Sequence, residues 1–249
     1  MSRPAYLRVD NSRSPDELGT RNSILETRLR YNLGMPTYLD VSTWPRRDLF
    51  DFFRTYENPY FNICAQLEVT KLLELLKTRP EVSASLTYHY FALRVANEIE
   101  PFKYRLRDDQ VLVHEVIHGG TTVLLPNESF TFAYFDYQQE FDKFMRDAQA
   151  SVRSVRTEVH PFEPLDGDDR IHFTVLPWVS FTSFAHARNK TRAVSVPKIA
   201  FGKFIRQNER TFLPTSVEVH HAMMDGLHVG RFFNRLEEMF AEPETFMVR

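Results

Sequence analysis

Glycine and cysteine are scarce in this sequence. Glycine occurs 8 times in 249 residues, and neither GxGxxG nor GxxxxGKS/T is present. The motifs that cradle phosphates with glycine backbone amides are therefore excluded. The single cysteine, Cys64, has no partner for an intramolecular disulfide, which fits a reducing compartment. A domain of this size buries roughly 70–75 % of its unfolded surface and needs no such cross-link.

Long apolar runs and an excess of charge are also missing. No stretch approaches the roughly 18 apolar residues of a membrane span. The first residues, MSRPAYLRVDNSRS, contain no apolar segment typical of a secretory signal. The formal net charge of −2 gives no reason to expect a nucleic-acid partner. These absences predict a soluble cytoplasmic protein that binds neither membranes nor nucleic acid.

Aromatic residues are abundant in the same chain. There are 22 phenylalanines, and aromatic residues make up 14% of the sequence. Such a composition indicates a heavily aromatic core, an apolar ligand pocket or large contacts between subunits. Composition alone does not choose among the three.

The character of the sequence changes near residue 38. Residues 1–37 are rich in Arg, Asn and Ser, and we interpret them as an N-terminal extension that is either loosely ordered or packed on a neighbouring subunit. Residues 38–249 read as a single domain of alternating strands and helices. Apolar periodicity predicts strands at 61–69, 110–117, 171–175, 197–205 and 213–221, an extended stretch at 121–134, and helices at 70–79, 83–98, 136–157 and 227–240. Thr70 and Asp136 are the candidate N-caps of their helices.

A cluster of polar residues, HHAMMDGLH, spans 220–228 and contains three of the nine histidines. It falls on a predicted strand-to-helix turn, where functional groups are often placed. A metal site is disfavoured because HExxH is absent and because His220 and His221, adjacent on a strand, point to opposite faces. A general base and a structural polar seam both remain open, and composition alone favours the seam.

The wider stretch VHHAMMDGLHVGRF resembles the HHAxCDGxHxxRF signature of the chloramphenicol acetyltransferases, which are CoA-dependent acyltransferases marked by HxxxD. Four further blocks resemble segments of that family and occur in the same order. They are STWPRRDLFDFF at 42–53, FKYRLRDDQVLVHEV at 102–116, FTVLPWVSFTSF at 173–184 and PKIAFGKF at 197–204. The resemblance covers about residues 38–240.

This resemblance implies a fold, an assembly and a co-substrate. The family fold is a two-layer α/β (α+β) sandwich, in which a mixed β-sheet has helices packed on one face. The family assembles as a homotrimer with each active site at a subunit boundary. Acetyl-CoA is the implied co-substrate, with no permanently bound cofactor and no metal.

The resemblance also assigns roles to individual residues. His221 matches the general base that deprotonates the acceptor hydroxyl, and Asp225 matches a structural carboxylate that pairs with Arg46. Thr174 stands where the family has a serine whose hydroxyl stabilises the oxyanion. Trp178 and Lys203 match positions near the CoA channel, although a core aromatic and a surface lysine are the alternative interpretations.

Departures from the family pattern concern the acceptor. Ala200 replaces a threonine that helps to bind acceptor, Phe53 replaces a tyrosine of the chloramphenicol pocket, and Met224 replaces the cysteine of CDG. The sequence therefore predicts O-acetyl transfer to chloramphenicol or a related acceptor. The alternatives are an acyltransferase for another alcohol or acyl chain and a non-catalytic trimer that binds a small apolar ligand.

Overall fold

The structure is a computed structural model that describes residues 37–157, 167–188 and 195–247. Thr37–Arg249 form one compact unit. Apart from Thr37, the predicted N-terminal extension lies outside the described residues.

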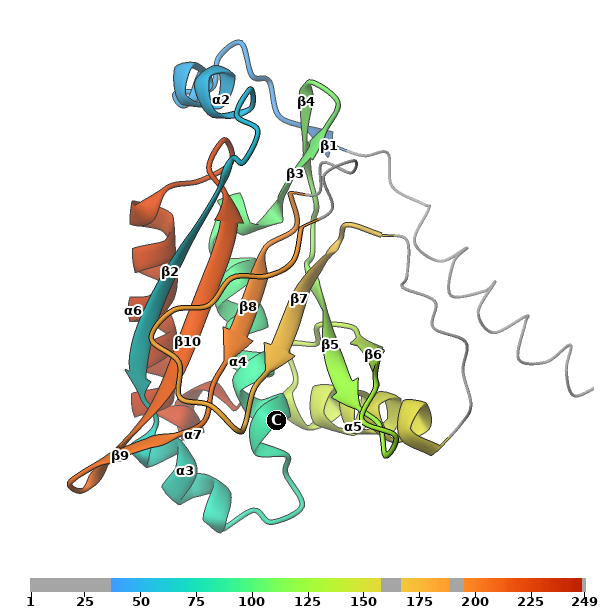
Figure 1. The fold of residues 1–249 in the computed structure, drawn as a ribbon, viewed down its shortest axis with the longest axis vertical. Coiled ribbons are helices and arrows are strands. Elements are labelled where there is room, and N and C mark those ends of the chain that lie inside the picture. The colour runs from blue at the N-terminus through green and yellow to red at the C-terminus, as the bar shows by residue number, and fades with distance from the viewer. Residues whose placement is uncertain (1–36, 158–166, 189–194, 248–249) are drawn as a thin grey trace, which may run out of the picture. The chain divides into compact units, whose positions relative to one another are not determined.

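A large mixed sheet organises the fold (Figure 1). Within the described residues it has seven strands in the order β2-β10-β8-β7-β5-β6, with β9 also paired to β10. β7 runs parallel to both β5 and β8, and the other pairs are antiparallel. The strands are β2 (Tyr60–Glu68), β5 (His118–Leu124), β6 (Phe130–Phe135), β7 (Arg170–Val175), β8 (Lys198–Phe201), β9 (Ile205–Gln207) and β10 (Arg210–His220).

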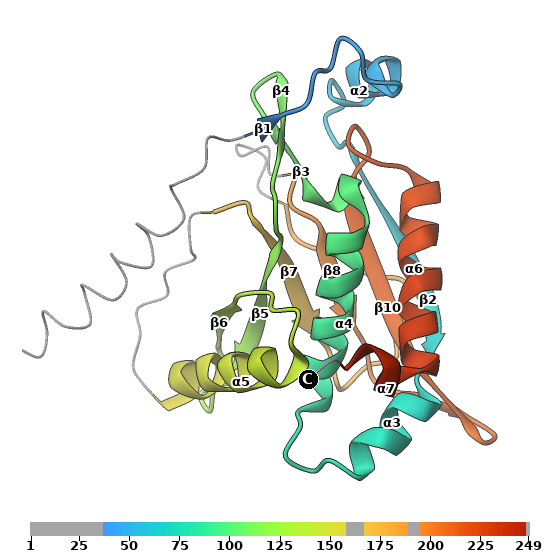
Figure 2. The same cartoon turned by 180° about the vertical axis from the view of Figure 1, so that it is seen from behind.

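Helices cover one face of this sheet, with α4 and α6 running in front of β8 and β10 in Figure 2. The helices are α3 (Thr70–Lys77), α4 (Ala84–Glu98), α5 (Phe141–Thr157), α6 (Gly226–Ala241) and α7 (Pro243–Phe246). Helix α2 (Arg47–Phe53), the short helix η1 (Glu100–Lys103) and a small sheet of β1 (Thr37–Tyr38), β4 (Gln110–Val113) and β3 (Tyr104–Arg107) complete the unit. The predicted two-layer sandwich with a mixed sheet is confirmed.

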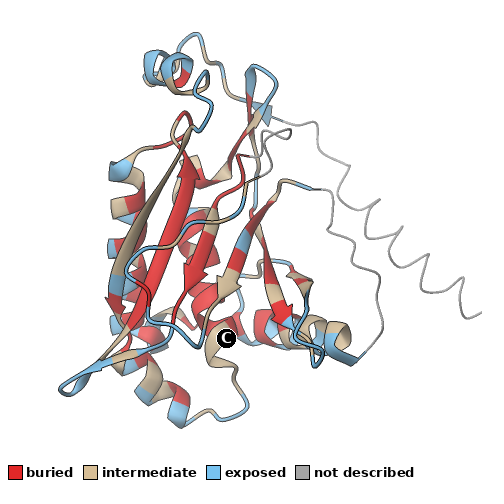
Figure 3. Ribbon diagram, in the orientation of Figure 1, coloured by how far each residue is buried: buried red, intermediate tan, exposed pale blue. Residues whose placement is uncertain are grey.

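Alternation along the strands separates an apolar face from a polar one. In β10, Val217 and Val219 join the core under the helices, whereas Glu218 and His220 point to the opposite face. We call that opposite side the open face. The whole central part of β10 is buried (Figure 3), because the segment from 176 to 188 crosses the open face in front of it (Figure 1).

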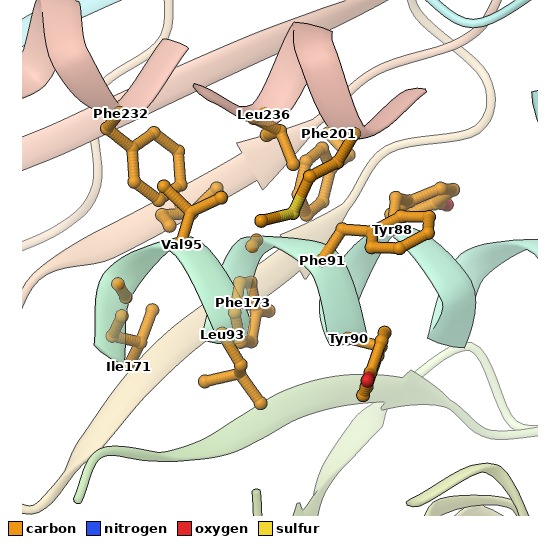
Figure 4. Packing of buried hydrophobic residues seen from close by; sticks show 14 of the residues in the cluster. Tyr88, Tyr90, Phe91, Leu93, Val95, Ile171, Phe173, Phe201, Phe232 and Leu236 are labelled. Carbon is orange, nitrogen blue, oxygen red and sulfur yellow. The ribbon is translucent and has the colours of Figure 1, made fainter. Parts of the chain in front are cut away.

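Aromatic rings fill the core between the two layers. Phe91 of α4 and Phe232 of α6 are fully buried there, together with Phe173 and Phe201 of the sheet (Figure 4). Each buried phenylalanine contributes roughly 1.5–3 kcal/mol of hydrophobic free energy relative to an exposed one. Much of the unusual phenylalanine content is thus in the core.

Both predicted N-caps are wrong. Helix α3 includes Thr70 itself and is preceded by Val69. The Thr70 hydroxyl instead accepts a hydrogen bond from the Thr211 amide at 2.9 Å and so ties the helix to β10. Helix α5 begins at Phe141, five residues beyond Asp136, so the Asp136 carboxylate is too far along the chain to cap it.

Two predicted strands are shorter or broken. The strand predicted at 110–117 ends at Val113. The strand predicted at 197–205 divides into β8 and β9 around Gly202, which packs tightly between Phe181 and Pro214. A side chain at Gly202 would contact both neighbours at about 3.0–3.1 Å. The break between β8 and β9 depends on this tertiary packing, so the apolar periodicity of the sequence does not predict it.

A titratable group lies inside the aromatic core. His89 of α4 is 1% exposed and its ring lies against Phe135, Phe173 and Phe201. Its Nδ1 hydrogen-bonds the Ser85 carbonyl, and its buried Nε2 has no partner. Burial lowers the pKa of His89 to about 4, although the bond to Ser85 opposes this shift.

We expect His89→Met to weaken the acid sensitivity of the fold. The unfolded chain titrates His89 near 6.5 and the folded chain near 4, so the unfolded state binds the proton more readily between these values. The stability due to the neutral ring is full above pH 6.5 and declines as the pH falls toward 4, by at most about 3 kcal/mol. Urea unfolding at several pH values measures this slope. An equal slope in wild type and variant would contradict the assignment.

Candidate active site

The histidine cluster lies on the turn that joins β10 to α6. His220 is the last residue of β10, and Asp225 is the N-cap of α6. The amides of Met223 and Met224 hydrogen-bond the His220 carbonyl at 3.0 and 3.3 Å. Both methionine side chains are buried, at 1% exposure each, so they hold the turn against the interior of the protein.

Arg46 and Asp225 form an ion pair that connects the start of α2 to the start of α6. The second terminal nitrogen of Arg46 also donates to the His221 carbonyl at 3.3 Å. The Asp225 carboxylate accepts the Leu227 amide at 3.0 Å. Burial opposes its ionisation, but Arg46 and His228 together hold the pKa of Asp225 below its usual value. The carboxylate is therefore fully occupied by structural contacts.

The His221 ring is held between two phenylalanines. It stacks on Phe53, with centroids 3.8 Å apart and planes 9° apart, and lies 4.6 Å from the ring of Phe61. Its Nδ1 lies 3.2 Å from the Met224 carbonyl. A carbonyl only accepts hydrogen bonds, so Nδ1 carries the proton and Nε2 keeps its lone pair. The ring thus has a fixed plane and the tautomer that a base requires.

The two neighbouring histidines have other partners. The Ala222 amide donates to Nδ1 of His220 at 3.2 Å, and burial lowers the pKa of His220 to about 4, with Arg188 and His221 adding to the effect. His228 accepts the Asp225 amide at 3.2 Å as half of a capping box for α6. Both rings therefore stabilise the turn.

Thr174 does not meet His221 within one chain. β8 lies between β7 and β10, and the register aligns Thr174, Ala200 and Ser216 across the sheet. The end of β10 is four residues beyond Ser216, which is about 13 Å along the strand, and Thr174 is about 10 Å away across two strands. His221 also contacts Phe61, which packs on the helix side, whereas Thr174 alternates with the core residue Phe173 and faces the open side.

Two of the remaining predicted site residues, Trp178 and Lys203, lie in or beside the segment after β7. Trp178 is 62% exposed, which excludes the core-aromatic interpretation. The Lys203 amide donates to the Val179 carbonyl at 2.9 Å, so Lys203 follows β8 beside this tryptophan segment. Ala200 is fully buried, and Phe53 is the ring that stacks on His221.

Two members of the site were not found from the sequence. Phe61 contacts His221 because β2 pairs with β10 in a register that places Phe61 opposite Val219. The Met224 carbonyl orients the His221 ring through backbone geometry. Neither contact has a local sequence signal, since the first depends on pairing between distant strands and the second on the shape of the turn.

The described residues contain neither a candidate metal site nor a candidate membrane-spanning helix. Nowhere among residues 37–157, 167–188 and 195–247 do three His, Cys, Asp or Glu side chains gather so that they could hold a metal ion. No helix in the described part of the chain has the length and apolar character needed to cross a membrane.

Asp225→Asn should destabilise the fold by about 1–3 kcal/mol. Asparagine still caps a helix, but it leaves Arg46, whose side chain is 14% exposed, without its counter-charge. The matched control is Asp51→Asn, because Asp51 forms exposed ion pairs with Arg47 and Arg54 and should cost less than about 1 kcal/mol. Urea unfolding compares the two. Equal losses of unfolding free energy in the two variants would show that the Arg46–Asp225 pair stabilises the fold no more than an exposed ion pair does.

Comparison with known proteins identifies the family. A family model described as chloramphenicol acetyltransferase matches residues 35–237. The chloramphenicol acetyltransferase of Streptomyces acrimycini is 30% identical over 84% of this chain and 96% of its own length. Chloramphenicol acetyltransferase 3 of Escherichia coli is 28% identical over 82% of this chain and 96% of its own.

Solved structures agree with this result. A chloramphenicol acetyltransferase structure matches with a TM-score of 0.76 and 28% identity, covering 83% of this chain and 100% of that one. The dihydrolipoamide acetyltransferase of Azotobacter vinelandii has a TM-score of 0.61 at 16% identity, covers 81% of this chain and 88% of its own, and shares the fold. The family resemblance predicted from the sequence is confirmed, and the chain belongs to the chloramphenicol acetyltransferase family of acyltransferases.

Proposed function

We propose that this protein is a CoA-dependent O-acetyltransferase in which His221 is the general base. The observation that carries the proposal is the fixed His221 ring, whose Nδ1 donates to the Met224 carbonyl while Nε2 keeps a lone pair. Acetyl-CoA is the co-substrate, since the chain belongs to a family of acetyltransferases. Residues 38–249 form the single acyltransferase domain.

The reaction is a direct transfer between two bound substrates. Nε2 of His221 takes the proton of the acceptor hydroxyl as its oxygen attacks the thioester carbonyl carbon. A C–O bond forms, the tetrahedral oxyanion collapses, and the C–S bond breaks. The proton on Nε2 then passes to the departing CoA sulfur, giving an acetyl ester and free CoA. A thioester is already activated, so one oriented base provides the main catalytic requirement.

The oxyanion donor comes from a second copy of the chain. Thr174 lies on the open face and more than 10 Å from His221 within one chain, by its strand register. A hydroxyl must approach to about 3 Å to stabilise an oxyanion. We therefore propose a homotrimer in which His221 of one subunit meets Thr174 of its neighbour. Trp178 and Lys203 line the CoA channel beside this boundary.

Two acceptor classes follow from the family and from its departures. The relatives are named for chloramphenicol, which makes a cytoplasmic antibiotic-resistance enzyme for chloramphenicol or a related alcohol the first candidate. An acyltransferase for another alcohol or acyl chain is the second. It is favoured because Ala200 and Phe53 each lack the hydroxyl that the family uses near the acceptor. Membership of an acyltransferase family argues against the non-catalytic ligand-binding trimer.

His221→Ala should lower acetyl transfer by at least about 100-fold, because general base catalysis contributes roughly 10²–10⁴-fold. Thiol release from acetyl-CoA, followed with chloramphenicol and a panel of other alcohols, measures the change. His114→Ala is the matched control, since His114 contacts Asp168 away from the turn. Unchanged turnover in His221→Ala would overturn the mechanism, and efficient chloramphenicol turnover by the wild type would remove the second acceptor class.

Co-expression of His221→Ala with Thr174→Val should restore activity that neither variant has alone. In randomly mixed trimers, about one quarter of the sites pair an intact His221 with an intact neighbouring Thr174. Loss of one oxyanion donor lowers the rate roughly 10²–10³-fold, so recovery to about a quarter of wild type is readily detected. Co-expressing each variant with itself is the control. No recovery in mixed trimers would contradict a site that His221 of one subunit shares with Thr174 of its neighbour.

A further inference from the structure

The open face of the large sheet carries charged side chains beside the row that contains Thr174. In β7, β8 and β10, core residues such as Phe173, Ile199 and Val217 point to the helices, so their neighbours point the other way. The outward set is Arg170, His172, Thr174, Lys198, Ala200, Ser216, Glu218 and His220.

One carboxylate on this face is already neutralised. Glu218 is 5% exposed and forms an ion pair with Arg188. It also accepts the His186 amide at 3.3 Å. The Arg188 guanidinium in turn lies 3.4 Å from the centre of the Tyr60 ring. The negative charge of Glu218 is therefore held by an arginine that is itself fixed in place.

Lys198 lies directly across from Glu218 in the register of β8 and β10, but within the described residues the two form no ion pair. Its ammonium donates to the Ala187 carbonyl at 3.0 Å, and among the described residues no carboxylate forms an ion pair with it. Burial and the nearby Arg188 lower the pKa of Lys198, and Glu218 opposes this only partly. A half-buried ammonium with two unused N–H donors is a strong site for an anion.

His172 stands next to Lys198. The two residues are in register across β7 and β8, and the His172 side chain is exposed. Burial of the ring nitrogens, followed by the nearby cations Lys198, Arg105, Arg170 and Arg188, lowers the pKa of His172 to about 4, so the ring is neutral near pH 7. The neutral imidazole thus offers one N–H donor close to the Lys198 ammonium.

His172 and Lys198 lie two residues along their strands from Thr174, beside which the reaction is expected to occur. Thr174 and Ala200 are the next in-register pair that points the same way on β7 and β8. Two residues along a strand correspond to about 7 Å. An acceptor whose hydroxyl reacts beside Thr174 would therefore extend to Lys198 and His172 with a group of ordinary molecular length.

We propose that Lys198 and His172 bind an anionic group of the acceptor, so that the substrate is an alcohol with a carboxylate or phosphate about 7 Å from its hydroxyl. This inference rests on the proposed function, because that function places the acceptor beside Thr174. A neutral acceptor would shield the Lys198 ammonium from water with only Glu218, which is already paired with Arg188, to compensate it, and that is unfavourable. An anionic one supplies the missing charge.

Three alcohols on one frame test the proposal. They are 4-(hydroxymethyl)benzoate, 4-(hydroxymethyl)phenyl phosphate and the neutral 4-(hydroxymethyl)benzamide. We expect the full-length wild-type protein to use at least one anion with kcat/KM about 10-fold or more above the amide. Lys198→Met should lower kcat/KM for that anion about 10- to 100-fold through KM, while changing the amide and the KM for acetyl-CoA less than about 3-fold.

Two further variants separate charge from folding. Lys198→Arg keeps the charge and should retain the preference for the anion. Lys77→Met, at the exposed end of α3, removes a lysine far from this face and should change nothing. Denaturation midpoints of all variants, with and without each alcohol, give a binding readout that does not need turnover.

The outcomes distinguish this inference from the proposed function. A wild type that prefers the amide over both anions, or a Lys198→Met variant that loses all three alcohols equally, overturns the anion site but leaves acetyl transfer intact. If no alcohol is acetylated above the His221→Ala rate, acetyl transfer to these acceptors fails. The binding readout then decides the anion site alone: stabilisation by an anion that depends on Lys198 supports it, and its absence overturns it.

Discussion

The placement of β10 between β2 and β8 is the constraint on which the rest of the molecule depends. Its eleven residues run from Arg210 to His220, and the strict alternation of a strand sends successive side chains to opposite faces. Val217 and Val219 thereby enter the helix-covered core, and Glu218 enters the charged network of the open face. The strand also ends where His221 begins the turn, so the end of β10 sets the position of this histidine.

A small number of polar contacts then convert that turn into a rigid element. Arg46 joins α2 to α6 through Asp225 and reaches the carbonyl of His221. The Met224 carbonyl and the Phe53 ring fix the orientation of the imidazole. Each of these groups acts on the histidine from a different direction. The carboxylate of Asp225 therefore supports the position of His221 through the backbone and does not need to touch the histidine ring.

Local sequence patterns predicted the helices and strands whose burial repeats along the chain. Apolar periodicity predicted α4 and β10 closely, because burial repeats along each element. The predicted start of α5 at Asp136 was wrong because several polar residues precede Phe141 and each could cap a helix. Tertiary packing determines that the helix begins at Phe141. The contact between Phe61 and His221 could not be predicted, because it depends on a register between strands more than 150 residues apart. Nor does local periodicity reveal that Thr174 and His221 lie on opposite sides of the sheet.

That separation has a consequence for how the candidate site is built. His221 is supported by α2, by the start of α6 and by Phe61 on the helix side. The outward residues of β7 and β8 contact a different set of neighbours on the open face. These contacts of His221 and those of the outward residues have no residue in common. The surroundings of His221 and the outward surface of β7 and β8 are thus built from separate parts of one scaffold.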